Sequence, residues 1–244
     1  MELLEKTSIK TAIILGIFFV IGAGIIGYTW MSVKASDNSL SVTGSAKQAV
    51  QSDTVKWNSN FSRRVLATDL KTGYAQMKND EAAVIKFLKD NGVADAEMTV
   101  SPVSMQKEYI YDKNGNAGPD QYTLMQTVLV QSNDINKITN LSKNTAAVIN
   151  QGVLFSSYAP EYYYSKLPEV RIALLPEAMK DAQTRAASIA QTTGKKVGVL
   201  KSATMGVVQV TQPNSTDVSD YGNYDVSTIN KEIMITVKAS FTLK

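Results

Sequence analysis

Hydrophobic and polar residues follow three different patterns along the chain, and the first is one long apolar run. No residue from Thr11 to Val33 is charged, and a lysine stands on each side of this run. The length matches the ~20 apolar residues that cross a bilayer. We therefore expect a transmembrane helix over residues 11–33, after a cytoplasmic segment of residues 1–10. Tyr28 and Trp30 lie near the far end of the run, where aromatic rings favour the membrane interface.

A cleaved signal peptide is the competing interpretation of this segment. Val33-Lys34-Ala35 has the small residues of a passable cleavage site. The apolar run is longer than the ~7–15 residues of a typical signal peptide, which favours an uncleaved anchor. Two lysines precede the run and one follows it, so we expect the amino terminus inside and the remainder outside.

After a linker at residues 34–39, the chain alternates between a two-residue period and a helical period. The two-residue period is typical of half-buried strands, and the period of 3.6 residues is typical of helices with one buried face. The expected strands are 40–46, 52–66, 97–111, 122–131, 153–164, 199–211 and 231–243. The expected helices are 69–91, 134–150 and 168–193. Within the last helix, Pro176 predicts a kink or a break.

These elements predict an α+β fold. We expect a mixed, largely antiparallel sheet packed with about three helices, in one domain over residues 40–244, because hairpin connections dominate. Residues 112–119 are expected to form a hairpin loop between two strands. The last two strands are expected to pair with each other, and residues 212–228 between them form a long polar loop.

Composition excludes several classes of function. The chain lacks both cysteine and histidine, which removes disulfides, zinc-thiolate sites and catalysis by a histidine base. Outside residues 1–35 there are 22 basic and 20 acidic residues. That balance gives no basic footprint for nucleic acid. No cofactor is expected.

The third helix carries a pattern that resembles a known family. Ala178, Ala182, Ala186 and Ala190 recur at every fourth position, and Gly194 follows them. Together with the opening Leu40-Ser-Val-Thr-Gly44, the step Val197-Gly-Val-Leu200 and the closing Val237-x-Ala239-x-Phe241, this order resembles SIMPL-domain proteins over about residues 40–244.

The resemblance implies an α+β domain of the bacterial envelope with no family-wide catalytic residues. Similar proteins include periplasmic immunogenic and stress-associated proteins, and some assemble into ring- or channel-like oligomers. We therefore expect a single-pass protein of the inner membrane whose bulk is periplasmic. It would act by self-assembly or by binding an envelope protein, with a link to envelope or oxidative stress.

Six tyrosines are the candidate interface residues. A tyrosine side chain is apolar with one polar tip, which suits protein interfaces. Four of the six are close together in one expected strand, and two lie in the polar loop. The candidates are Tyr158, Tyr162, Tyr163, Tyr164, Tyr221 and Tyr224. Ordinary core and surface tyrosines are the alternative.

Two groups of aspartate and asparagine residues could in principle bind a cation, but neither has the spacing of a defined site. Asp112, Asn114 and Asn116 begin like a calcium loop, yet the later positions lack the required glycine and glutamate. A plain turn is the preferred interpretation. Asp217, Asp220 and Asp225 are expected to belong to a solvated loop, with cation binding left open.

A catalytic site is not recognisable in the sequence. Glu161, Glu169 and Glu177 could supply paired carboxylates only at a separation that a sequence does not reveal. Arg185 is expected to pair with Asp181 on the same helix. A hydrolase using carboxylates or a Ser-Lys pair, and a module that binds a small ligand, remain the alternatives to assembly.

Overall fold

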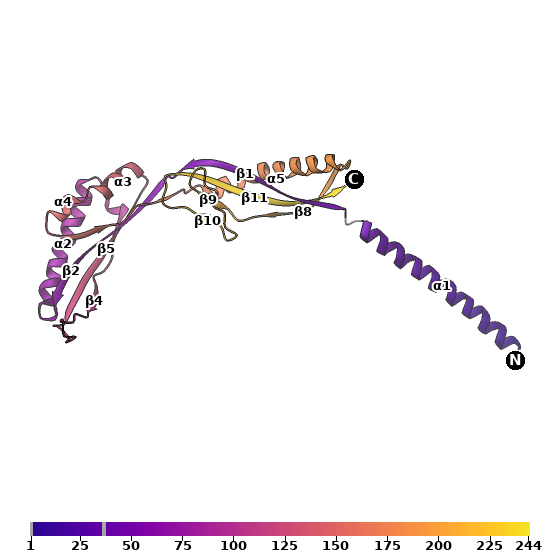
Figure 1. Ribbon diagram of the computed structural model, residues 1–244, viewed down its shortest axis with the longest axis horizontal. Coiled ribbons are helices and arrows are strands. Elements are labelled where there is room, and N and C mark those ends of the chain that lie inside the picture. The colour runs from indigo at the N-terminus through magenta and orange to yellow at the C-terminus, as the bar shows by residue number, and fades with distance from the viewer. Residues whose placement is uncertain (1, 36–37) are drawn as a thin grey trace. The chain divides into compact units, whose positions relative to one another are not determined.

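The computed structural model describes the backbone of residues 2–35 and 38–244, and the side chains of residues 14–32 and 38–244 (Figure 1). The chain divides into two compact units. The α5 unit comprises Met1–Ala46, Ala173–Val207 and Ile235–Lys244. The β2 unit comprises Lys47–Ile172 and Val208–Met234. Each unit is therefore assembled from segments that are far apart in the sequence.

The described elements confirm an α+β fold with two mostly antiparallel sheets. The helices are α1 (Glu2–Ala35), α2 (Leu70–Asp90), α3 (Ile135–Lys143), α4 (Ala146–Ile149) and α5 (Leu167–Thr192), with short 3-10 turns at Ala67–Asp69 and Asp95–Glu97. The strands are β1 (Ser39–Gln51), β2 (Thr54–Leu66), β3 (Met98–Val100), β4 (Ser104–Glu108), β5 (Gln121–Ser132), β6 (Leu154–Ser157), β7 (Glu161–Tyr163), β8 (Val197–Met205), β9 (Gln209–Thr211), β10 (Asn223–Tyr224) and β11 (Asn230–Leu243).

A six-stranded sheet forms the β2 unit. Its order is β3-β5-β2-β6, with β4 also on β5 and β7 also on β2. The long central pair runs from Val55 opposite Ser132 to Leu66 opposite Gln121 without a register shift. Helices α2, α3 and α4 lie over one face of this sheet (Figure 1). The expected hairpin loop joins β4 to β5, and an isolated bridge between Tyr111 and Ala117 closes it.

Large side chains fill the core of the β2 unit. The alternation in β2 places Val55, Trp57 and Phe61 inward, and all three are fully buried. The rings of Trp57 and Phe155 meet edge to face with centroids 6.2 Å apart. Met77, Val84 and Leu88 of α2, with Ile138 and Leu141 of α3, cover them from the helical side. Burial of this many large apolar side chains is the main stabilising contribution to the unit.

The α5 unit packs with small residues. Ala182 and Ala186 of α5 lie against Val42 of β1 and against Ala239 and Phe241 of β11. At Gly44, an added Cβ would fall on the Ala178 carbonyl oxygen and on the backbone nitrogen of Ala182. Helix and strand backbones therefore approach so closely that only glycine fits. Asp181 fixes the contact, since its carboxylate accepts a 2.8 Å hydrogen bond from the Ser45 N–H.

Four expected elements are interrupted in the structure. The single helix expected over 134–150 is two helices, α3 and α4, which Asn144 and Thr145 separate. The strands expected over 97–111, 153–164 and 199–211 are each two shorter strands. Pro102 and Pro160 lie in the first two gaps, because proline has no N–H for a sheet ladder. Helix α5, by contrast, continues through Pro176, so the alternative of a break there is wrong.

Candidate functional site

The tyrosine-rich part of the β2 unit brings β7 and β10 together. The rings of Tyr163 and Tyr224 lie with centroids 5.9 Å apart and planes 30° apart. The Tyr164 N–H donates a 2.9 Å hydrogen bond to the Tyr224 hydroxyl. On β2, the Lys56 ammonium lies 4.9 Å from the centroid of the Tyr163 ring. This is a cation–π contact, and it adds to the aromatic pair.

Glu161 controls the ionisation of the Tyr163 hydroxyl. The Tyr163 hydroxyl donates a 2.7 Å hydrogen bond to the Glu161 carboxylate. That bond, together with burial, raises the pKa of Tyr163 to about 12. A phenolate so close to a carboxylate is disfavoured, so Tyr163 is a firm hydrogen-bond donor and not a base at neutral pH.

Behind the tyrosine pair is a completely buried lysine. Lys231 has no exposed surface, and its ammonium donates to the Asp225 backbone carbonyl. It also lies 3.4 Å from an Asp225 carboxylate oxygen and 5.9 Å from the Tyr224 ring centroid. Burial lowers the pKa of Lys231, and Asp225 opposes this shift. The ammonium therefore serves to hold the 225–231 turn against β10.

Asp225 is the centre of a compact hydrogen-bond network. Its carboxylate accepts from the Ser227 N–H at 3.0 Å, from the Ser227 hydroxyl at 2.6 Å and from the Thr228 N–H at 3.2 Å. The Thr228 hydroxyl is a further donor. Burial alone would raise the pKa of Asp225, but these donors and the Lys231 charge hold it well below its ordinary value.

The other candidate tyrosines occupy three different environments. Tyr162 points into the core, and its hydroxyl lies 3.0 Å from the Thr139 hydroxyl. Tyr158 is exposed, and its hydroxyl accepts a 2.7 Å bond from the Asn60 amide. Along β2 it lies about 13 Å from the strand position that pairs with Tyr163. Tyr221 is 97% exposed.

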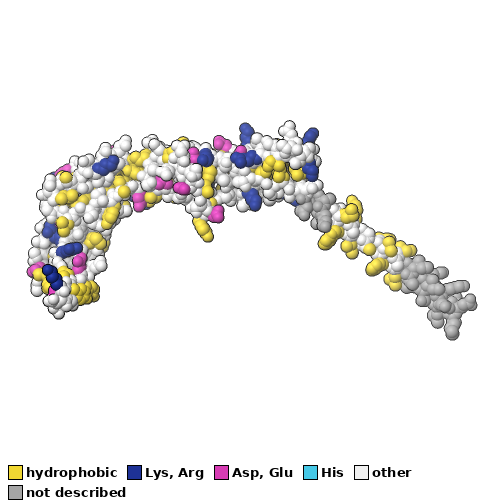
Figure 2. Space-filling view, in the orientation of Figure 1, with side chains coloured by type: hydrophobic (Ala, Val, Ile, Leu, Met, Phe, Trp, Pro, Cys, Tyr) yellow, Lys and Arg dark blue, Asp and Glu magenta, His cyan; other side chains and the backbone are white. Residues whose placement is uncertain are grey.

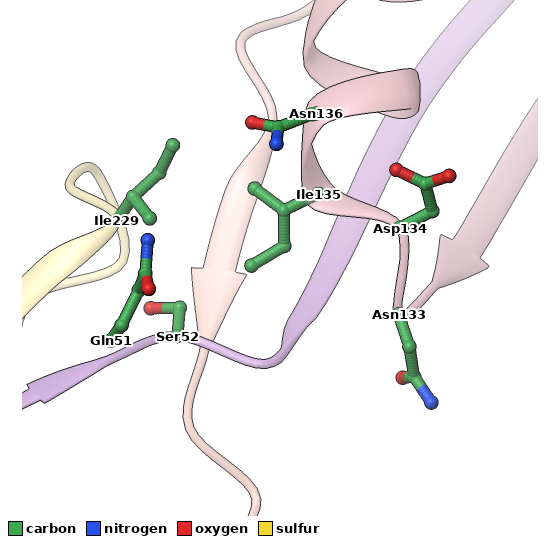
Figure 3. A pocket seen from close by; sticks show the side chains of 7 residues that line it. All are labelled: Gln51, Ser52, Asn133, Asp134, Ile135, Asn136 and Ile229. Carbon is green, nitrogen blue, oxygen red and sulfur yellow. The ribbon is translucent and has the colours of Figure 1, made fainter.

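A polar pocket of about 520 Å³ opens elsewhere in the β2 unit, between the β1–β2 connection and the start of α3 (Figure 3). It is lined by Gln51, Ser52, Asn133, Asp134, Ile135, Asn136 and Ile229. The Ser52 side chain is 4% exposed, and its hydroxyl has no hydrogen-bond partner among the described residues. In Figure 3, Gln51 and Ser52 lie beside Ile229, and Asn136 faces them from α3.

No group of three or more acidic residues is placed to hold a metal ion in the described part of the chain. Asp112 is engaged by its own loop, since it accepts from the N–H groups of Asn114 and Asn116 at 2.8 Å. This is the turn that the sequence predicts. In the 212–228 loop, Asp225 has the partners described above, while Asp217 and Asp220 are exposed.

The remaining charged candidates are also dispersed. Glu161 is bonded to Tyr163, whereas Glu169 and Glu177 are exposed on α5. The expected pair between Arg185 and Asp181 is present at 2.8 Å.

Two charged pairs, each with one buried member, were missed by reasoning from the sequence. Lys231 is two positions before Ile233 and so lies on the inward face of β11. This alternation is visible in the sequence and could have identified Lys231 as buried. Arg63 occupies an inward position of β2 and forms a bidentate ion pair with Asp80 of α2. In one of the two contacts, the Arg63 Nη2 donates to the Asp80 Oδ1 at 2.7 Å. A charge at an inward position predicts a buried partner.

The amino-terminal helix provides the last candidates. Ile14–Ser32 has a mean hydropathy of 2.0, and none of it is buried by the rest of the described chain. Tyr28 and Trp30 are 77% and 68% exposed. The Thr29 hydroxyl donates to the Ile25 carbonyl at 2.8 Å, so this polar group is satisfied within the helix. Length and composition fit either a membrane anchor or a signal sequence.

Taken together, the class is an α+β domain with an apolar amino-terminal helix and a tyrosine-rich surface. Residues 40–242 match the SIMPL family, described as a protein of unknown function (DUF541). The chain therefore belongs to the SIMPL family, as the alanine-repeat helix and its flanking strands indicate. No curated protein matches the chain.

Two solved structures show distant similarity. An amidase of the hydantoinase/carbamoylase family from Burkholderia phymatum is 11% identical with a TM-score of 0.26, over 48% of this chain and 32% of that one. The YXEP protein of Bacillus subtilis, a dinuclear metal-binding peptidase of the M20 family, is 10% identical with a TM-score of 0.17, over 50% of this chain and 28% of that one. This chain thus corresponds to about a third of either protein.

Proposed function

We propose that the protein is anchored in the cytoplasmic membrane by a single transmembrane helix. Its SIMPL domain would lie on the extracytoplasmic side and act by self-assembly or by binding an envelope protein. The observation that carries this proposal is the 19-residue apolar segment Ile14–Ser32, of which nothing is buried against the described chain. Exposing this much apolar surface to water is unfavourable, and a bilayer removes it from water.

Membrane extraction tests the anchor. The full chain is expected to stay in membranes through an alkaline carbonate wash and to leave only in detergent. Its mature amino terminus, read by mass spectrometry, should still include residues 1–35. A mature protein that begins after Ala35 and is soluble would replace the anchor with a cleaved signal peptide.

The tyrosine-rich surface supports a binding role. Tyr163 and Tyr224 are partly exposed and rigidly held by Glu161, Lys56 and the Asp225 turn. Rigid aromatic side chains lose little conformational entropy when they are buried at an interface. On this proposal the domain acts by contact and not by catalysis, and no reaction is assigned to it.

Tyr158 and Tyr221 lie outside the Tyr163–Tyr224 pair, and their exposed side chains test whether the proposed interface extends to these candidates. We expect Tyr158→Ser combined with Tyr221→Ser to shift detergent-extracted protein from an oligomer towards monomer in a sizing column with light scattering. Tyr109→Ser is the matched control, because Tyr109 is 75% exposed in the β4–β5 loop of the same unit. An oligomer that is unaffected by the double variant, or equally weakened by the control, contradicts a role for these tyrosines in self-assembly.

A second candidate function, binding a small polar ligand, rests on Ser52. An unpartnered buried hydroxyl is costly, and a ligand with hydroxyl or amide groups would satisfy it. We expect glucose or N-acetylglucosamine to shift the amide NMR signals of Ser52 and Asn136, and Ser52→Ala to abolish those shifts. Ser59→Ala is the control, because the buried Ser59 hydroxyl already donates to the Val128 carbonyl at 3.3 Å. The absence of any shift with either sugar would count against binding of these probes.

A further inference from the structure

Side-chain charge is divided unequally between the two units. In the α5 unit, the three segments 38–46, 173–207 and 235–244 have together seven basic and two acidic residues, a net charge of +5. The β2 unit has 15 basic and 17 acidic residues, a net charge of −2. Figure 2 shows Lys and Arg side chains, in dark blue, over the part of the molecule that Figure 1 labels α5 and β8.

Neither of the two acidic residues in these three segments forms an ion pair with Lys195, Lys196 or Lys244. Both are in the first half of its α5 segment, where Asp181 is already paired with Arg185. Residues 182–207 and 235–244 contain no Asp or Glu. Lys195, Lys196 and Lys244 are exposed, and no ion pair involves them within the described residues.

Backbone hydrogen bonds gather these three lysines at one end of the unit. Lys196 and Lys244 exchange two N–H to carbonyl bonds, of 2.9 and 2.8 Å. The Leu243 N–H donates to the Asn38 carbonyl at 2.9 Å. Lys195 follows Gly194, whose φ of +70° ends helix α5 at this point. Three distant segments of the sequence therefore meet beside Asn38.

Asn38 is covalently close to the apolar helix. Two residues separate it from Ala35, the last residue of α1, so three Cα–Cα steps limit their separation to about 11 Å. Lys244 then lies within about 20 Å of the helix end, and its strand partner Lys196 within about 5 Å more. This bound follows from the length of the chain and these backbone hydrogen bonds, and it holds for any orientation of the helix.

We propose that Lys195, Lys196 and Lys244 form a docking surface for the headgroups of anionic phospholipids in the leaflet where α1 emerges. The proposal rests on the anchoring function proposed above. A shallow cavity of about 540 Å³ at this end is lined by Lys195 and Lys196 and by the apolar Ala187 and Val197. Lysine and apolar side chains lining one cavity suit a phosphate headgroup and the start of its acyl chains.

The docking would hold the α5 unit against the bilayer instead of leaving it free on its tether. Each lysine near an anionic surface raises the equilibrium constant for the bound position by about fivefold. Since such attraction is screened within about 10 Å at 0.1 M salt and about 3 Å at 1 M, the contact is salt-dependent.

A single-cysteine fluorescence experiment tests the surface, because the chain has no cysteine of its own. The full chain is reconstituted in phosphatidylcholine vesicles, with or without equimolar phosphatidylglycerol, and labelled at Thr193→Cys. A trace of lipid with a nitroxide headgroup quenches the label. We expect stronger quenching in the anionic vesicles, lost at about 1 M salt.

Charge variants make the test specific. Lys195→Gln, Lys196→Gln and Lys244→Gln together should remove the dependence on phosphatidylglycerol. The matched control neutralises three exposed lysines of the β2 unit that have no ion pair among the described residues, Lys71, Lys78 and Lys113, and should keep it.

Flotation separates the possible failures. A chain that does not float with either kind of vesicle overturns the anchor, and this inference with it. A chain that floats but is quenched equally in both kinds of vesicle overturns the lysine surface alone. Binding of soluble DNA by the same lysines at about 0.1 M salt, without a preference for anionic vesicles, would assign the surface to a soluble polyanion instead.

Discussion

The two units of this protein are built by opposite packing strategies. The β2 unit surrounds Trp57 and Phe61 with large aliphatic side chains from three helices. The α5 unit brings one helix against β1 and β11 through alanines and Gly44. Large side chains stabilise by the apolar area that they bury, whereas small ones stabilise by letting backbones approach closely.

The difference in charge follows the same division. The unit that continues from α1 is basic, and the unit that carries the tyrosines is slightly acidic. A basic, tightly packed unit suits contact with lipid headgroups, and a unit with rigid exposed aromatics suits contact with protein. The comparison suggests that membrane docking and partner binding are divided between the two units.

The largest expected effect is in the β2 core. Trp57→Ala should lower the free energy of unfolding of that unit by about 4 kcal/mol, because it leaves a cavity beside Phe155. It also removes the donor to the Ser157 hydroxyl, now at 3.1 Å. Hydrogen exchange of the β2 and β5 amides measures the loss. Trp57→Phe is the control and should cost clearly less, and equal losses would show that ring size is not what stabilises this core.

The second expected effect comes from enlarging a small residue, whereas the first came from truncating a large one. Gly44→Ala adds one methyl group and should destabilise the α5 unit by about 3 kcal/mol, since the Ala178 and Ala182 backbones block the position. Thr43→Ala, at an exposed position of the same strand, should change stability by less than about 0.5 kcal/mol. Hydrogen exchange of β1 and β11 reports both. If the Gly44→Ala variant is as stable as the Thr43→Ala variant, close backbone packing at Gly44 does not stabilise the α5 unit, and the distinction between the two packing strategies is wrong.

Periodicity predicted the elements of both units far better than their interruptions. The inward positions of β2 and the alanine stripe of α5 were predicted because a buried face repeats every second or every fourth residue. The gap between α3 and α4 at Asn144 and Thr145 was not, because the apolar spacing continues across it. Whether a short helix ends depends on tertiary packing more than on local preference.

The candidate site was predictable only in part. Tyrosine density was visible in the sequence, but the contact between Tyr163 and Tyr224 depends on the parallel pairing of β10 with β9. Such non-local pairing leaves no local pattern. The gathering of Lys195, Lys196 and Lys244 was hidden for the same reason, because these residues meet only through the β8 and β11 ends.

A third effect concerns acid stability. The pKa of Asp225 is lowered in the folded state, so its contribution is present above about pH 4 and is lost as the pH falls through the folded-state value. Asp225→Asn should reduce stability at pH 7 by about 2 kcal/mol and should flatten the loss between pH 4 and pH 2. Urea unfolding followed by Trp57 fluorescence measures this dependence. Lys238→Gln, an exposed change in the α5 unit, is the control and should keep the acid slope of the wild type. An unchanged slope in Asp225→Asn would place the acid sensitivity elsewhere.

The smallest expected effect lies in the alkaline range and concerns Tyr163. Its pKa is raised to about 12, so the hydrogen bond to Glu161 stabilises the fold below about pH 10 and is lost as the pH rises towards 12. Tyr163→Phe should cost about 1 kcal/mol at pH 7 and should remove one tyrosine from the last step of an ultraviolet titration. Tyr109→Phe, at an exposed site, is the control and should leave that last step unchanged. If both variants remove the same step, Glu161 does not hold Tyr163 in the rigid position that the proposed interface requires.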